Sequence, residues 1–132
     1  MKKKILIVVA NYYEQISDEL LNSAKKALQE PFDLISVPGV FEIPVTIAKN
    51  IKKYDGFIAL GCIIKGETSH FDFISKAVID GIMKLSIENK KPIGNGIITC
   101  LNLEQALPRR KKGHEAAVAL LSVLDPVKTS TE

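Results

Sequence analysis

Four aliphatic runs, separated by segments with helical spacing, constrain the fold of this chain more than any other feature. The two longest runs are Lys4–Ala10 (KILIVVA) and Gly56–Ile64 (GFIALGCII). Uninterrupted β-branched and aliphatic sequences are typical of strands buried on both faces, as in a parallel sheet covered by helices. Two further runs, Phe32–Val37 and Ile93–Thr99, predict two more strands.

Apolar residues recur at helical spacing in the segments between these runs. The alternation of strands and helices predicts the α/β class, as a single flavodoxin-like three-layer α/β/α sandwich with a four-stranded parallel sheet. Residues 125–132 are expected to form a polar tail. The predicted helices are Ile16–Glu30, Phe41–Lys53, His70–Asn89, a short one from Asn102 that Pro108 stops, and Gly113–Leu124.

Length and composition narrow the class of protein. The 132 residues suit one domain, residues 1–132, and 46% apolar with 25% charged residues is ordinary for a globular protein. The longest uncharged run is too short to span a membrane, and the apolar run after the first lysines is too short for a secretion signal, so we expect a cytoplasmic protein. A net charge of +3 is too weak to indicate nucleic-acid binding. Cys62 and Cys100 lie in strand-like runs and are expected to be buried thiols without zinc-ligand spacing.

The loops after the strands are where a ligand is expected. In open parallel sheets, ligands bind beyond the carboxyl ends of the strands. The sequence places four loops there: Asn11–Gln15, Pro38–Glu42, Lys65–Ser69 and Cys100–Asn102.

The loop that enters the third long helix offers an anion site. Free backbone N–H groups and the helix dipole favour an anion at a helix start, Gly66 permits close approach, and Thr68 and Ser69 add hydroxyl donors. His70 follows directly and could transfer protons. The sequence is not a Walker A loop. A capped helix with nothing bound, and a histidine exposed to water, remain equally open.

The other candidate binding residues each allow a functional and a structural interpretation. Glu42 lies among apolar residues, so it could meet a polar ligand or cap the following helix. Tyr12 or Tyr13 could stack on a flat heterocycle or merely cover the sheet edge. The basic run at residues 109–112 could be a solvated loop or an anion site. The turn after the first strand lacks glycine, which argues against a dinucleotide cofactor.

Three segments resemble the lumazine synthase family. They are VPGVFEIP at residues 37–44, LGCIIKGETSHF at residues 60–71, and GIIT with EQA at residues 96–99 and 104–106. The likeness runs from Lys4 to about Leu124. It implies condensation of 5-amino-6-(D-ribitylamino)uracil with 3,4-dihydroxy-2-butanone 4-phosphate to 6,7-dimethyl-8-ribityllumazine, phosphate and water, with no metal or organic cofactor.

The resemblance also implies roles for individual residues. His70 falls at the family's proton-transfer histidine, and Tyr12 falls where a phenylalanine usually stacks on the pyrimidine. Asn95 matches a position contacted from a neighbouring subunit. The remaining implied substrate contacts are Val40, Phe41 and Glu42 for the ribityl chain, Cys62, Ile63 and Ile64 for the uracil, and Glu67, Thr68, Arg109 and Lys112 for the phosphate.

Two departures from the family pattern bear on these roles. Tyr13 stands where the family commonly has asparagine, and the segment between the phosphate arginine and Lys112 is short. Either Arg109 or Arg110 could therefore hold the phosphate, and a local deletion could weaken its binding. The family forms pentamers with shared active sites, so we expect a homopentamer that is not assembled into a capsid. A non-catalytic flavin- or nucleotide-binding module and an inactive shell protein are the alternatives.

Overall fold

A computed structural model of the chain describes residues 3–67 and 70–127. Strands and helices alternate along most of this length, and two short 3₁₀ turns, η1 and η2, precede the second and third α-helices. The elements are β1 Ile5–Ala10, α1 Glu14–Leu28, β2 Asp33–Val37, η1 Val40–Glu42, α2 Ile43–Asn50, β3 Gly56–Ile64, η2 Lys65–Glu67, α3 Phe71–Asn89, β4 Ile93–Cys100, α4 Leu103–Arg109 and α5 Lys112–Leu124.

The four strands form one parallel sheet in the order β2-β1-β3-β4. The two central strands are buried along their whole length, as their unbroken aliphatic sequences predict. Both outer strands include exposed residues, because each has a neighbour on one side only. This is the predicted parallel sheet, and its order is that of a flavodoxin-like fold.

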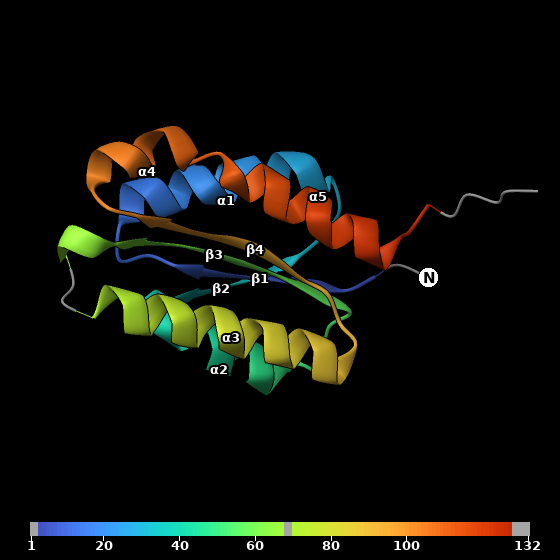
Figure 1. Ribbon diagram of the computed structural model, residues 1–132. Coiled ribbons are helices and arrows are strands. Elements are labelled where there is room, and N and C mark those ends of the chain that lie inside the picture. The colour runs from blue at the N-terminus through green and yellow to red at the C-terminus, as the bar shows by residue number, and fades with distance from the viewer. Residues whose placement is uncertain (1–2, 68–69, 128–132) are drawn as a thin grey trace, which may run out of the picture.

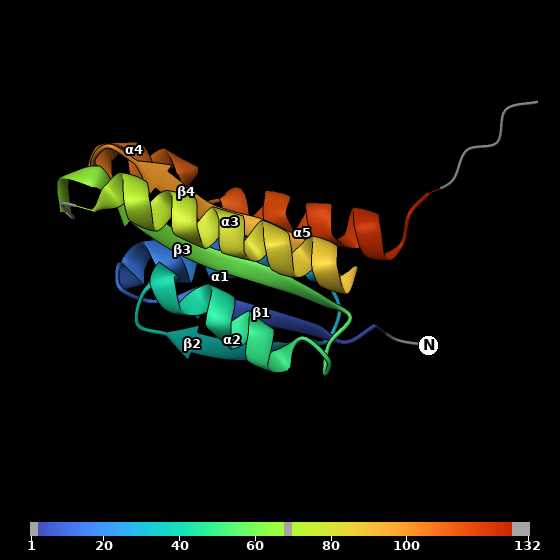
Figure 2. The same cartoon turned by 60° about the horizontal axis from the view of Figure 1, so that its bottom comes forward.

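Helices cover both faces of the sheet, which confirms the three-layer prediction. Helices α1, α4 and α5 lie on one face, and α2 and α3 lie on the other (Figure 1). The turned view brings α2 and α3 in front of the sheet (Figure 2). The turn η2 and helix α4 lie at one end of the sheet, opposite the end from which the amino-terminal segment enters β1. No helix within residues 3–67 and 70–127 is long and apolar enough to cross a membrane.

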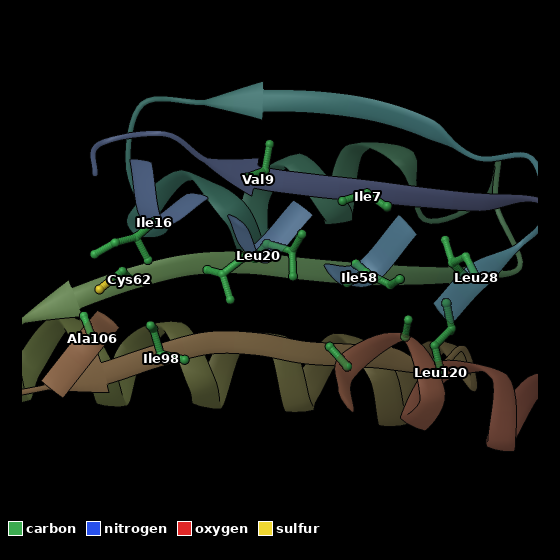
Figure 3. Packing of buried hydrophobic residues seen from close by; sticks show 14 of the residues in the cluster. Ile7, Val9, Ile16, Leu20, Leu28, Ile58, Cys62, Ile98, Ala106 and Leu120 are labelled. Carbon is green, nitrogen blue, oxygen red and sulfur yellow. The ribbon is translucent and has the colours of Figure 1, made fainter. Parts of the chain in front are cut away.

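Each face of the sheet has its own apolar cluster. On the α1 and α5 side, alternate residues of β1, β3 and β4 pack against helix residues such as Ile16, Leu20 and Leu120. Figure 3 shows Ile16, Cys62 and Ala106 at one end of this cluster, close to the carboxyl ends of the strands. The cluster therefore supports the edge of the sheet where a ligand is expected.

Two glycines let α5 approach its neighbours closely. A Cβ atom at Gly113 would lie 2.0 Å from the Leu20 carbonyl oxygen of α1, and one at Gly94 would lie 2.2 Å from the Ala116 carbonyl oxygen. No side chain fits at either position without a shift of backbone. Helix α5 is thus held against both α1 and the edge strand β4.

Several helix boundaries differ from the predictions by one to three residues, and two of these differences have a clear physical cause. The second helix begins at Ile43 instead of Phe41, because Val40–Glu42 form a 3₁₀ turn before Pro44 enters the first helical turn. Helix α4 continues past Pro108 to Arg109. A proline so close to the helix end removes one backbone hydrogen bond without breaking the helix.

Candidate active site

A hollow of about 260 Å³ opens at the carboxyl ends of β1, β2 and β3. This is the edge of the sheet that the sequence predicts for a ligand. The walls come from the β1–α1 connection, the β2–η1 connection, the end of β3 and the first turn of α3. The lining residues are Tyr12, Tyr13, Gly39, Val40, Phe41, Cys62, Ile63, Ile64 and Ile74.

Tyr12 and Tyr13 form the aromatic wall of this hollow. Their rings meet edge to face, with centroids 4.9 Å apart and an angle of 84° between the planes. The Tyr12 side chain is 72% exposed, so most of its ring surface is open to a ligand. A flat heterocycle could stack on such a ring, as predicted.

The opposite wall is the turn that joins β2 to α2. The Gly39 backbone N–H donates to Glu42 Oε1 at 3.0 Å, so this carboxylate caps its own turn. Val40 is buried, and its Cγ1 would lie 2.6 Å from a Cβ atom at Gly61 of β3. Because Gly61 has no side chain, Val40 can pack directly against β3. Glu42 itself lines a neighbouring groove between α2 and α3 instead of the hollow.

Cys62 contributes an uncharged thiol to the floor. Cys62 is only 6% exposed. Burial, together with the nearby Cys100, raises the pKa of the Cys62 thiol to about 12. A thiol with this pKa stays protonated at neutral pH and is a poor nucleophile. Both cysteines are buried and free, which confirms their predicted structural role.

The turn η2, which precedes α3 in the chain, lies close to the β4–α4 connection. A Cβ atom at Gly66 would lie 3.7 Å from the Leu101 carbonyl oxygen, so η2 runs beside this connection. His70 is exposed and precedes the first helical residue, and its carbonyl oxygen accepts the Ile74 N–H at 2.9 Å. The sequence predicted His70 as the first residue of this helix, whereas the helix begins one residue later, at Phe71. Thr68 and Ser69 lie outside the described residues, and Glu67 is described only as part of η2.

The two adjacent arginines point in different directions. Arg109 Nη1 donates to the Thr99 carbonyl oxygen at 3.2 Å and lies 3.8 Å from Cys100 Sγ, at the carboxyl end of β4. Arg110 Nη1 donates to the Leu107 carbonyl oxygen at 2.6 Å, and its Nε lies 3.8 Å from Glu19 Oε2 on α1. Arg109 thus lies at the strand ends, whereas Arg110 faces α1.

Other predicted contacts lie apart from the hollow. Asn95 is exposed on the edge strand β4, where its Oδ1 accepts the Ile97 N–H at 3.0 Å. Lys112 is the first residue of α5. Neither residue lines the hollow.

One lining residue was not predicted. Ile74 lines the hollow and also packs against the apolar cluster on the α2 and α3 side of the sheet, as an apolar residue at helical spacing is expected to do. It lies four residues after His70, one turn along the same helix, and that spacing is the only sequence signal that could have indicated it.

Two other features of the described residues can be compared with this site. Within residues 3–67 and 70–127, no three His, Cys, Asp or Glu side chains gather in a way that could hold a metal ion. A second hollow of about 390 Å³ lies at the opposite edge of the sheet, between Lys4, Phe32 and Tyr54. It contains none of the predicted site residues, so the hollow at the carboxyl edge is the better candidate.

The fold and the hollow define a flavodoxin-like α/β protein with a candidate ligand site at the carboxyl edge of a parallel sheet. Comparison with known families narrows this class. The sequence profile of the family described as 6,7-dimethyl-8-ribityllumazine synthase matches residues 2–128. The chain belongs to this family.

Relatives of known name agree with the family match. A 6,7-dimethyl-8-ribityllumazine synthase of Bartonella tribocorum is 45% identical, with 94% of this chain and 91% of the relative covered. The synthase of Agrobacterium fabrum is 42% identical, with 94% of each chain covered. The Bartonella alignment spans 137 positions, more than the 132 residues of this chain, so that relative carries residues without a counterpart here. Such a difference is expected if the segment before Lys112 is shortened.

Proposed function

We propose that this protein condenses 5-amino-6-(D-ribitylamino)uracil with 3,4-dihydroxy-2-butanone 4-phosphate to give 6,7-dimethyl-8-ribityllumazine, phosphate and water, a step of riboflavin biosynthesis. The observation that carries the proposal is the hollow itself. It gathers Tyr12, the β2–η1 turn and the end of β3 into one site, and the turn and the strand end belong to two of the segments that resemble the family. A flavin- or nucleotide-binding module without activity and an inactive shell protein are not favoured, because the named relatives are synthases.

The aromatic part of the hollow suits the uracil. The open face of Tyr12 would stack on the pyrimidine ring, and the backbone of Cys62, Ile63 and Ile64 would meet its polar edge. The ribityl chain would run past Val40 and Phe41 towards Glu42. One carboxylate oxygen of Glu42 already accepts the Gly39 N–H, and the other would accept ribityl hydroxyls.

The basic part of the site suits the phosphate. The start of α3 would supply backbone N–H groups and the positive end of the helix dipole, together with Glu67 and Thr68 of the preceding loop. Arg109 is the better candidate for the phosphate contact, because it lies at the end of β4 while Arg110 is turned towards Glu19. Its planar guanidinium can bind two phosphate oxygens at once. Lys112 would add positive charge from the start of α5.

His70 would move the protons. Imine formation, phosphate elimination, ring closure and loss of water each require a proton to be given or taken near the bound substrates. His70 caps the start of α3, four residues before Ile74, which lines the hollow. Positioning of the two substrates would supply the rest of the rate enhancement.

The protein would act as a homopentamer with its sites between subunits. An open groove of about 490 Å³ between α2 and α3 is lined by apolar groups of Phe41, Pro44 and Val45. Phe41 and Val45 are more than half exposed, as is Phe73 nearby on α3. Apolar surface of this kind is typical of an interface. Phe41 lines both the groove and the hollow, so a second subunit in the groove would border the substrate site, where Asn95 of a neighbour could reach it.

We also propose that the protein works in the cytoplasm. Both proposed substrates are polar, and one is phosphorylated, so neither crosses a membrane unaided.

A direct assay tests the proposed activity. The purified protein is mixed with both substrates, and lumazine absorbance and fluorescence are followed together with release of inorganic phosphate. We expect lumazine and phosphate to appear in equal amounts and well above the rate of the uncatalysed condensation. Heat-unfolded protein is the control. A rate no higher than that control would overturn the proposal.

A further inference from the structure

The aromatic wall of the hollow has little packing of its own to hold it in place. Tyr12 is 72% exposed, and its ring meets Tyr13 edge to face. With so few packing contacts, the place of the ring depends on the backbone from which the side chain projects. The hydrogen bonds of the β1–α1 connection therefore decide where the ring lies.

Hydrogen bonds fix this connection on its helix side. The Ser17 hydroxyl, which is buried, donates to the Ala10 carbonyl oxygen at 2.5 Å. The Ser17 backbone N–H donates to the Tyr13 carbonyl oxygen at 2.9 Å. The end of β1 is thereby tied to the first turn of α1.

The strand side is fixed by one residue, Asn11. Its backbone N–H donates to the Val37 carbonyl oxygen at 3.0 Å, and its side-chain Nδ2 donates to Ser36 Oγ, also at 3.0 Å. Ser36 and Val37 end β2 and lead into the turn that carries Val40. The Asn11–Ser36 bond therefore joins the two walls of the hollow, one with Tyr12 and the other with Val40.

We infer that Asn11 and Ser36 are positioning residues, whose hydrogen bond sets the Tyr12 ring at the right distance from the β2–η1 wall for a pyrimidine. The inference rests on the proposed function and extends it to residues that do not line the hollow. Both side chains are exposed, so water can replace the lost partner and removal of the bond costs little stability. Loss of the Asn11–Ser36 hydrogen bond should instead appear as weaker binding of the pyrimidine.

Calorimetric titration with 5-amino-6-(D-ribitylamino)uracil alone tests this role without turnover. We expect Asn11→Ala and Ser36→Ala each to raise the Kd for this compound about three- to tenfold, the range set by one hydrogen bond. The double variant should bind no more weakly than the weaker single variant, because both substitutions remove the same bond. Ser36→Thr keeps the hydroxyl and should restore binding to within about twofold.

Two controls separate positioning from a general loss of structure. The Kd for inorganic phosphate and the melting temperature should stay close to those of the unmodified protein in every variant. Asn89→Ala removes an exposed amide that bonds the Leu85 carbonyl oxygen at the far end of α3, and it should change neither Kd.

The failures are distinguishable. An unchanged Kd for the uracil in both single variants, or additive effects in the double variant, would overturn the positioning role and leave the proposed function intact. A second outcome is that the unmodified protein binds the uracil and the variants weaken this binding as expected, but no lumazine forms. That outcome would overturn the proposed activity and support the positioning role. Absence of uracil binding to the unmodified protein would overturn both.

Discussion

The two parts of the proposed site are built in different ways. The part for the ring is set on the ends of three neighbouring strands, with buried Val40 and Cys62 in its walls and with backbone hydrogen bonds across its edges. The part for the phosphate consists of the exposed start of α3 and the exposed side chain of Arg109. The sheet therefore shapes the ring pocket in advance, whereas the phosphate part depends on a few surface charges and one helix end. Substitutions in the ring pocket should therefore alter how well the pyrimidine fits. Substitutions in the phosphate part should alter the charge that meets the phosphate and the transfer of protons.

The reactivity of the Cys62 thiol tests how well the ring pocket is closed to solvent. Because burial raises the pKa of Cys62 to about 12, about a thousandfold less thiolate is present at pH 8 than for an ordinary cysteine. Alkylation by iodoacetamide should be slower by about this factor in the folded protein. The rate should rise about tenfold per pH unit above pH 8, as long as the protein stays folded.

Mass spectrometry of the labelled peptide measures this rate, and the chain unfolded in urea is the reference. Labelling of Cys62 in the native protein at the rate of the unfolded chain would mean that the floor of the hollow opens readily.

The proton-transfer role of His70 predicts the next largest effect. His70→Ala should lower kcat about 10- to 100-fold, because one proton-transfer group is lost while substrate positioning remains. The KM values for both substrates should change much less than kcat. Steady-state kinetics of His70→Ala and of the unmodified protein measure this difference, and melting curves show whether both proteins are folded. An unchanged kcat would rule out proton transfer by His70.

The contrast between the two arginines predicts a smaller and more selective effect. Arg109→Ala should raise KM for the butanone phosphate about tenfold, as expected for a charge-assisted hydrogen bond, with little change in KM for the uracil. Arg110→Ala is the matched control and should leave both KM values nearly unchanged, because Arg110 faces Glu19. The reverse pattern would assign the phosphate to Arg110.

The smallest effect is expected at the aromatic wall. Tyr12→Ala should raise KM for the uracil about fivefold through loss of stacking, whereas Tyr12→Phe should stay within about twofold. KM for the butanone phosphate should not change in either variant. Equal increases for both substrates would show that Tyr12 supports the whole site instead of the ring alone.

The strands and helices could be predicted from the sequence because their signals are local. An unbroken aliphatic run such as Ile5–Ala10 can be buried on both faces only in the interior of a sheet, and the structure places it there. The 3₁₀ turn at Val40–Glu42 was missed, because a short apolar stretch before a proline has the same composition as the first turn of a helix.

The site could be predicted only in part. Tyr12 and Phe41 were expected near one another because parallel strands end at one edge, and they do line one hollow. Cys62, which the resemblance implied as a contact, lines the same hollow. Ile74 was missed because an apolar residue at helical spacing has the same pattern whether it packs in a core or borders a pocket. The proposed role of Asn95 depends on a neighbouring subunit, so only the family resemblance indicated it.

The central claim is that a phosphate and a ring occupy separate parts of one site at the carboxyl edge of the sheet. A crystal structure of the protein grown with inorganic phosphate and 5-amino-6-(D-ribitylamino)uracil tests this most directly. We predict density for phosphate between the start of α3 and Arg109, and for the pyrimidine against Tyr12. An empty carboxyl edge, or both molecules bound elsewhere, would contradict the account.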